Sequence, residues 1–190
     1  LCVQEHVADH IFDMVAGAAA TLTLGDPSHP ATHVGPVIDA ESKERLDGWI
    51  AKHEKHIRYR WDNDHALPAR GLFVPPAIIE LERASDLQEE VFGPILHVVR
   101  FRAHELHRLL DEIESNGTGL TLGIHSRIDA RVSEIANRLA NGNVYVNRNM
   151  VGAVVGTQPF GGTRLSGTGP KAGGPNYLRR FATEQVIAIN

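Results

Sequence analysis

An acidic and an aromatic side chain stand two residues apart in the segment EEVFGP at 89–94. A carboxylate such as Glu90 can accept hydrogen bonds from ribose hydroxyl groups, and a flat ring such as Phe92 can pack against a cofactor. The Gly-Pro pair that follows is typical of a turn, and an apolar run begins directly after it. Open α/β sheets bind ligands at the carboxyl ends of their strands, where we expect this segment to lie. Taken alone, an acidic residue before a turn is more often simply solvated.

A glycine-rich stretch at 151–175, with eight glycines, predicts a long irregular loop. Loops of this length in compact domains usually have a function. The P-loop pattern GxxxxGK[ST] fails here because Thr168 stands where lysine is required. The dinucleotide pattern GxGxxG fails because the third glycine comes one residue late. We therefore expect the phosphates of any bound nucleotide to be held elsewhere.

Two side chains are candidate nucleophiles, and neither has the surroundings that catalysis needs. Cys2 is the only cysteine and lies in the apolar run Leu1-Cys2-Val3, which we interpret as a buried strand. A core thiol is therefore favoured over a reactive one. Ser166 lacks the GxSxG pattern of a nucleophile elbow and is interpreted as a turn serine.

Composition excludes several classes of protein. The chain has 190 residues, of which 42% are apolar and 22% charged, as in a globular protein of one large domain or two small ones. The net charge of −4 gives no electrostatic footprint for nucleic acid. No apolar run reaches the ~18 residues of a transmembrane helix. The pairs His53/His56 and His104/His107 have helical spacing, but the further ligands of a zinc site, such as a cysteine pair or an HExxH motif, are missing, so no metal site is predicted. A single cysteine suits a reducing cytoplasm.

The apolar pattern alternates between helical and strand periodicity, which predicts an α/β fold with an open, mostly parallel sheet flanked by helices. Asp39 is expected to cap the second helix, and Gly142 to end the fourth. The expected helices are 4–20, 40–55, 103–115, 129–140 and a short one at 176–181. The expected strands are 58–61, 72–74, 95–101, 120–124, 143–146 and 185–189, and those between 95 and 147 are expected to share one parallel sheet.

Several segments, in order along nearly the whole chain, resemble the aldehyde dehydrogenase family. They are EEVFGP at 89–94, GLTLGIHSR at 119–127, GNVYVN at 142–147 and QPFGGTRLSGTG at 158–169. Other segments are most similar to the glutamate-semialdehyde (1-pyrroline-5-carboxylate) dehydrogenase branch and, within it, to the bacterial bifunctional proline utilization A proteins. These are GDPSHPATHVGPVIDAESKERL at 25–46, GAVVGTQPFGG at 152–162 and SGTGPKAGGPNYLRRFATEQ at 166–185.

The resemblance implies a part of the catalytic domain at 1–181, followed by a C-terminal strand at 182–190 that serves oligomerisation. It implies a cytoplasmic enzyme of proline catabolism that oxidises glutamate semialdehyde to glutamate with NAD and forms homo-oligomers. FAD is implied only if a proline dehydrogenase domain lies upstream. In this reaction a cysteine thiolate attacks the aldehyde, a hydride passes to NAD, and a water activated by a glutamate releases the acid.

Site residues carry over from the resemblance position by position. Glu90 corresponds to the glutamate that holds the nicotinamide-side ribose, and Phe92 to the aromatic residue beside it. Gly152 and Ala153 correspond to the loop that anchors the substrate carboxylate through backbone N–H groups. Some relatives have serine where this chain has Ala153, so one hydroxyl contact is missing. Phe160 corresponds to the aromatic wall beside the aliphatic chain of the aldehyde.

The resemblance places the nucleophilic cysteine and the general-base glutamate upstream of Leu1, so no residue of the chain is assigned a catalytic role. Cys2 is not that nucleophile, and the 190-residue chain alone is expected to be inactive. Two alternatives stay open. The substrate can be a different aldehyde, or the segment can be a non-catalytic module for oligomerisation or binding, with strand 185–189 pairing to another subunit.

Overall fold

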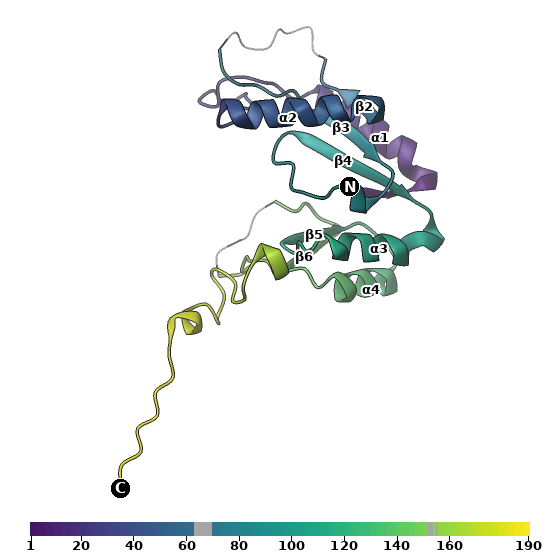
Figure 1. Ribbon diagram of the computed structural model, residues 1–190. Coiled ribbons are helices and arrows are strands. Elements are labelled where there is room, and N and C mark those ends of the chain that lie inside the picture. The colour runs from purple at the N-terminus through teal and green to yellow at the C-terminus, as the bar shows by residue number, and fades with distance from the viewer. Residues whose placement is uncertain (63–69, 152–153, 155) are drawn as a thin grey trace. The chain divides into compact units, whose positions relative to one another are not determined.

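The computed structural model describes residues 1–62, 70–151, 154 and 156–190 (Figure 1). The chain divides into two compact units, Leu1–Glu112 and Ile113–Asn190. Each unit has its own sheet and is described by itself. The predicted α/β class is confirmed, because helices alternate with strands and most strand pairs are parallel.

The first unit is built on a four-stranded sheet in the order β1-β4-β3-β2. Its strands are β1 (Cys2–Gln4), β2 (Ile57–Arg60), β3 (Ala77–Leu81) and β4 (Ile95–Phe101). β4 pairs in parallel with both β1 and β3, whereas β2 runs antiparallel to β3 along the other edge. The two central strands β3 and β4 are the most apolar, which suits a sheet covered on both faces.

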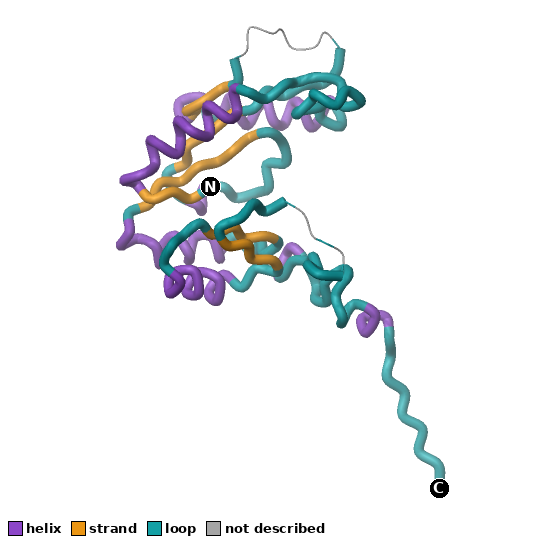
Figure 2. Tube along the Cα trace, turned by 180° about the vertical axis from the view of Figure 1, so that it is seen from behind, coloured by secondary structure: helices purple, strands orange, loops and turns teal. Residues whose placement is uncertain are grey.

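Two helices, α1 (Glu5–Ala20) and α2 (Ala40–Lys52), cover opposite faces of this sheet (Figures 1 and 2). The core beneath α1 consists of Val3, Ala8, Phe12, Ile78 and Val98. On the α2 side, the indole N–H of Trp49 donates to Nε2 of His97 at 2.9 Å. Asp39 caps α2 as predicted, because its carboxylate accepts from the backbone N–H of Ser42 at 2.7 Å.

α3 (Leu106–Ser115) follows a short 3₁₀ turn at Ala103–Glu105 and leads from the first unit into the second. In the second unit, β5 (Thr121–Ile124) and β6 (Asn143–Val146) pair in parallel and are joined by α4 (Asp129–Leu139). The remainder of this unit is loop, with single 3₁₀ turns at Arg164–Ser166 and Leu178–Phe181.

Two predicted strands do not form among the described residues of this chain. Residues 72–74 are irregular, and β3 begins after Pro75 and Pro76, where sequence analysis placed no strand. Proline has no N–H for the ladder, so pairing starts only beyond the two prolines, although the carbonyl of Pro76 accepts from Trp61. Residues 185–189 are exposed and pair with no strand among the described residues of this chain, so their pairing with another subunit stays a prediction.

Two further predictions about the second half are corrected. Gly142 does not end α4; the cap is Ala140, which adopts a left-handed conformation with φ of 45°. The strands between 95 and 147 do not share one sheet either. β4 pairs with β1 and β3 in one sheet, and β5 pairs with β6 in the other.

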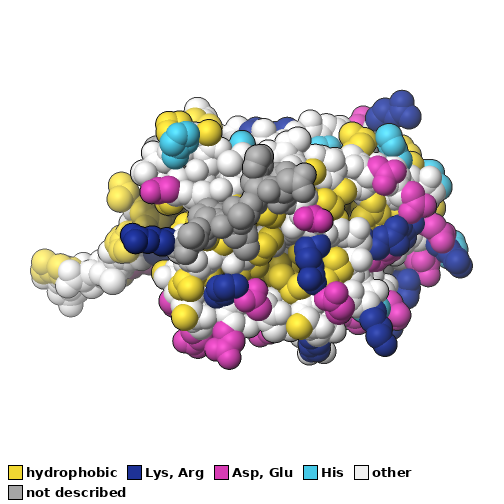
Figure 3. Space-filling view, turned by 90° about the horizontal axis from the view of Figure 1, so that it is seen from above, with side chains coloured by type: hydrophobic (Ala, Val, Ile, Leu, Met, Phe, Trp, Pro, Cys, Tyr) yellow, Lys and Arg dark blue, Asp and Glu magenta, His cyan; other side chains and the backbone are white. Residues whose placement is uncertain are grey.

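The surface carries charges of both signs. On the face seen in Figure 3, the described basic and acidic side chains lie interspersed, as the nearly balanced counts of 19 and 23 predict. Among the described residues, none of the helices combines the length and the apolar character that crossing a membrane requires.

Candidate functional site

The loop at 82–94, between β3 and β4, presents both predicted cofactor contacts at the surface. Glu90 is exposed, and the Phe92 side chain is 78% exposed. The expectation that they follow the carboxyl ends of parallel strands is wrong. They directly precede β4, and the carbonyl of Pro94 accepts from the N–H of Ala77 at the start of β3, so this end of the loop lies at the amino ends of both strands.

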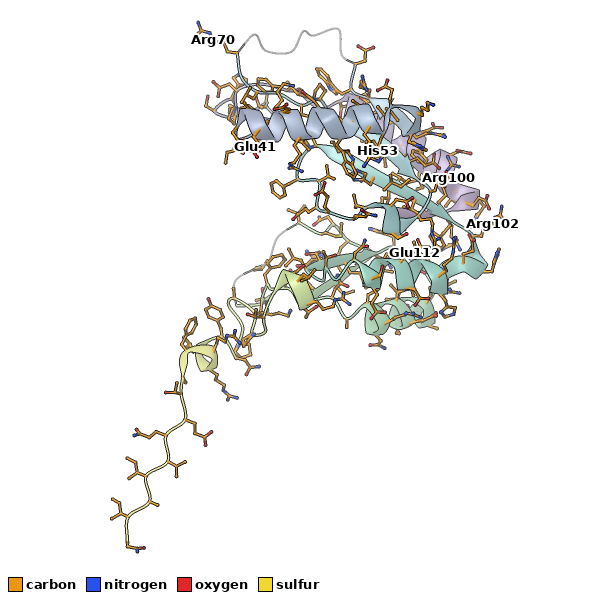
Figure 4. All side chains as sticks on the ribbon, in the orientation of Figure 1. Glu41, His53, Arg70, Arg100, Arg102 and Glu112 are labelled. Carbon is orange, nitrogen blue, oxygen red and sulfur yellow. The ribbon has the colours of Figure 1, made fainter. Side chains whose placement is uncertain are left out.

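A buried carboxylate fixes the beginning of this loop. Glu112 on α3, labelled in Figure 4, is only 7% exposed. Its Oε1 accepts from Nε and Nη2 of Arg83 at 2.9 and 2.7 Å, and its Oε2 accepts from the backbone N–H of Ala84 at 3.0 Å. The N–H of Arg83 in turn donates to Oδ2 of Asp86 at 2.9 Å. We call this arrangement the Glu112 clamp. Its charge-assisted bonds are stronger than neutral ones.

A close apolar contact fixes the end of the same loop. Gly93 lies so near Leu46 of α2 that a Cβ at this position would be 2.6 Å from the leucine Cδ1. Leu46 is completely buried, so it has little room to yield. The carbonyl of Gly93 also accepts from the N–H of Ile95 at 2.8 Å. Glu90 and Phe92 therefore stand on a short exposed segment whose two ends are held.

A polar pocket of about 570 Å³ lies between α2 and this loop. It is lined by Trp49, Lys52, His53, Asp86, Gln88 and Glu89. The rings of Trp49 and His53 lie 4.4 Å apart, and Trp49 also reaches His97. Burial is the main cause that lowers the pKa of His97 from its ordinary 6.5 to about 4, so the ring stays neutral and accepts the indole N–H.

The glycine-rich stretch of the second unit holds the predicted substrate contacts. Gly152 and Ala153 lie outside the described residues. Phe160 is half-buried, and its backbone exchanges two hydrogen bonds with Ala172, of 3.1 and 3.0 Å. The backbone at Phe160 is thus fixed inside the loop, and the residue as a whole is partly exposed.

Neutral hydrogen bonds hold this loop against β5 and β6. The side-chain amide of Asn143 bonds to Pro159 and Gly161, and the hydroxyl of Ser166 accepts from the N–H of Gly119 at 3.0 Å. The hydroxyl of Thr163 lies 3.3 and 3.2 Å from the carbonyls of Gly119 and Ala140. These contacts bring the signature segment at 158–169 onto the strand pair.

Cys2 is not the buried core residue that its apolar neighbours suggested. β1 is an edge strand, and its alternation buries Val3 beneath α1 while Cys2 stays exposed on the other side. Nearby protein atoms still shield the sulfur, and this desolvation raises the pKa of the thiol. A thiol with a raised pKa forms less of the reactive thiolate, and the absence of a catalytic role for Cys2 stays a prediction.

Sequence reasoning missed two residues that position the candidate site, Glu112 and Asn143. Glu112 lies beside Leu109 at the edge of the apolar stripe of the helix at 103–115, and this position gave only a weak signal for a buried carboxylate. Asn143 begins the strand signal GNVYVN, and nothing in its local pattern indicated a partner in the glycine-rich loop.

Comparison with known proteins was consistent across sequence and structure. A profile described as "Aldehyde dehydrogenase family" matches residues 1–187. The chain is 48% identical over 198 residues to "Bifunctional protein PutA" of Escherichia coli (strain K12), covering 100% of this chain and 15% of that protein. It is 35% identical over 190 residues to "1-pyrroline-5-carboxylate dehydrogenase 1" of Halalkalibacterium halodurans, covering 98% and 36%.

Solved structures agree with these matches. A mutant of Bradyrhizobium japonicum Proline Utilization A (PutA) superposes with a TM-score of 0.90 at 60% identity, over 97% of this chain and 19% of that one. A 1-pyrroline-5-carboxylate dehydrogenase from Thermus with bound NAD superposes with a TM-score of 0.82 at 31% identity, over 95% and 35%. The chain spans about 15% of the length of the curated PutA relatives that it matches.

Proposed function

The chain belongs to the aldehyde dehydrogenase family, and from this premise we propose that it is the C-terminal part of an NAD-dependent glutamate-semialdehyde (1-pyrroline-5-carboxylate) dehydrogenase. The observation that carries the proposal is the family match over residues 1–187. The named relatives whose alignments cover 93–100% of this chain are PutA proteins and 1-pyrroline-5-carboxylate dehydrogenases. We further propose that the longer enzyme acts in proline catabolism in the cytoplasm as a homo-oligomer, with FAD only if a proline dehydrogenase domain precedes it.

The loop at 82–94 supports a cofactor-binding role. NAD, when bound, accepts the hydride that leaves the aldehyde carbon. The carboxylate of Glu90 accepts hydrogen bonds from the ribose hydroxyls, and the ring of Phe92 packs beside the cofactor. Both side chains are exposed and stand on a segment fixed at its two ends, which is the arrangement that holding a ligand in one orientation needs.

The glycine-rich loop supports a substrate-positioning role. The Phe160 ring lies beside the aliphatic chain of the aldehyde, and the backbone N–H groups at Gly152 and Ala153 hold the substrate carboxylate. The assignment of the last two residues rests on the family resemblance alone. The nucleophilic cysteine and the glutamate that activates water are expected in the sequence upstream of Leu1.

The proposal is tested by NADH formation in the longer enzyme that contains this chain. We expect Glu90→Gln to raise the KM for NAD about tenfold, since a charge-assisted hydrogen bond contributes about 1.5–3 kcal/mol. Ala153→Asp should raise the KM for glutamate semialdehyde far more than the KM for propanal, because the added carboxylate repels only the charged substrate. Equal effects on the two aldehydes contradict the substrate assignment, and a wild-type enzyme without NAD-linked aldehyde oxidation contradicts the activity.

A non-catalytic oligomerisation module is the second candidate. The observation that favours it is the exposed tail at 182–190, where the apolar side chains of Val186, Ile187 and Ile189 are 74–89% exposed. The upstream sequence discriminates between the two. A Gly-Gln-x-Cys run just before Leu1 supports the enzyme, and its absence supports the module.

A further inference from the structure

We propose that Asn143 is a positioning residue for the substrate site, acting through Phe160. The inference rests on the proposed function, in which the Phe160 ring forms a wall beside the aldehyde. Asn143 itself is the first residue of β6, and its backbone N–H donates to the carbonyl of Leu120 at 2.9 Å. It therefore belongs to the strand pair and not to the loop that it contacts.

The amide of Asn143 brackets Phe160 in the chain. Its Nδ2 donates to the carbonyl of Pro159 at 3.0 Å, and its Oδ1 accepts from the N–H of Gly161 at 3.1 Å. These two partners stand directly before and directly after Phe160. One side chain thus fixes the peptide on each side of the aromatic residue, with donor and acceptor each used once.

The remaining backbone groups of this segment are also bonded. The N–H and carbonyl of Phe160 pair with Ala172, and Nζ of Lys171 donates to the carbonyl of Gly161 at 2.7 Å. Every backbone donor and acceptor of residues 159–161 therefore has a partner. With the backbone held on both sides, the direction in which the Phe160 ring leaves the loop is set mainly by the strand pair and by segment 171–172.

Only a side-chain amide serves both contacts from position 143. An aspartate offers two acceptors, so its carboxylate would repel the carbonyl of Pro159 while still accepting from Gly161. Alanine would leave the carbonyl of Pro159 and the N–H of Gly161 without their hydrogen-bond partners. Both groups lie in partly buried residues, so each lost hydrogen bond lowers the stability of this segment. Either change frees the peptides that flank Phe160, and the ring is displaced relative to the substrate.

The experiment measures aldehyde selectivity in the longer enzyme. We expect Asn143→Ala and Asn143→Asp to raise the KM for glutamate semialdehyde about tenfold and the KM for propanal less than twofold, because a short aldehyde does not reach the wall. Ser126→Ala is the matched control: it removes a hydroxyl of the same unit that accepts from the N–H of Ile128 at 3.1 Å, outside the glycine-rich loop, and should leave the ratio of the two KM values unchanged. A double-mutant cycle with Phe160→Leu should be non-additive, with little further effect of Asn143→Ala once the ring is gone.

Hydrogen exchange provides a second readout that does not depend on activity. In the 190-residue chain, exchange of the Gly161 amide should accelerate at least tenfold in Asn143→Ala, and less in Asn143→Asp, which keeps the acceptor. The inference is overturned if Phe160→Leu changes selectivity and the Asn143 variants do not, or if the effects simply add. If the wild-type enzyme does not oxidise glutamate semialdehyde, the proposed function is wrong. If hydrogen exchange of the Gly161 amide is unchanged in Asn143→Ala, Asn143 does not position this segment, whatever the activity of the enzyme.

Discussion

The two loops that carry the candidate contacts are held in opposite ways. The loop at 82–94 is fixed at its ends, by the Glu112 clamp and by the contact of Gly93 with Leu46, and its middle is exposed. The described part of the glycine-rich loop, from 158 to 172, is held at several points along its length, mostly by neutral hydrogen bonds such as those of Asn143, Thr163 and Ser166. An exposed span between two anchors suits contact with a large cofactor, whereas continuous docking suits a wall that must keep one shape.

The largest expected effect comes from close backbone packing in the second unit. A Cβ at Gly142 would lie 1.9 Å from the carbonyl oxygen of Gly161, and backbone cannot move aside as a side chain can. We expect Gly142→Ala to lower the free energy of unfolding by about 3 kcal/mol or more. Circular dichroism during urea unfolding, with hydrogen exchange of the β5 and β6 amides, measures this.

Gly48→Ala in α2 is the control for that variant. Apart from its two chain neighbours and the backbone of its own helix, no described atom lies within 4 Å of the added methyl group, so the helix should gain about 0.5–1 kcal/mol. If Gly142→Ala is tolerated as well as Gly48→Ala, the glycine-rich loop is not docked as tightly as described.

The second largest effect tests the ionic anchor of the other loop. Glu112→Ala removes a buried acceptor of three hydrogen bonds, and we expect a loss of about 2 kcal/mol, less than for a fully buried pair because the Arg83 side chain is 52% exposed. Both tryptophans lie in the first unit, so tryptophan fluorescence follows its unfolding.

Glu54→Ala is the matched control in the same unit. Glu54 also pairs with an arginine at 2.7 Å, but both it and Arg60 are exposed, so the loss should be under about 0.5 kcal/mol. Equal losses in the two variants would contradict the idea that burial makes the Glu112 clamp strong.

A third prediction concerns pH, and it involves the strand that follows the loop at 82–94. His97 has a pKa of about 4 in the fold, below its ordinary 6.5, because the ring is partly buried and neutral. As pH falls from 6.5 towards 4, unfolded chains bind a proton that the fold excludes, so stability decreases. Since the ring is only partly buried, we expect about 1 kcal/mol between pH 6.5 and 4.5.

In His97→Gln, the free energy of unfolding should change less between pH 6.5 and 4.5. The glutamine amide oxygen can still accept from the indole N–H of Trp49, but it does not bind a proton in this range. Urea unfolding followed by tryptophan fluorescence at the two pH values checks it. The lowered pKa of the Asp39 carboxyl, held by its bonds to Ser42, affects stability only below its ordinary 3.8 and lies outside this window. An unchanged slope in His97→Gln would show that other groups cause the pH dependence.

The smallest expected effect on stability is at the exposed middle of the first loop. Phe92→Leu should change the free energy of unfolding by less than about 0.5 kcal/mol, because the ring is 78% exposed, while the KM for NAD rises in the longer enzyme. Phe12→Leu, at a buried ring that the guanidinium groups of Arg58 and Arg100 both contact, should lose about 1–2 kcal/mol. A large loss of stability in Phe92→Leu would mean that this loop depends on its middle and not on its ends.

Much of the fold follows from local patterns. The helices at 4–20 and 129–140 and the Asp39 cap were predictable because apolar periodicity and capping act within a few residues. The order of motifs indicated the family and so marked Glu90 and Phe160. The start of β3 was missed because the prolines before it obscured a buried apolar run that has no alternation.

Local pattern therefore determined the helices, the family and which loops carry the candidate contacts. The tertiary structure decided which residues hold those loops, since Arg83 and Glu112 are 29 residues apart in the chain and Asn143 and Gly161 are 18 apart. It also decided that Cys2 is exposed. Three consecutive apolar residues give the same sequence pattern in a central strand and in an edge strand, so the sequence could not distinguish the two. The physical reason is range: periodicity and capping act between near neighbours in sequence, whereas burial and hydrogen-bond partners depend on which distant segments fold against each other.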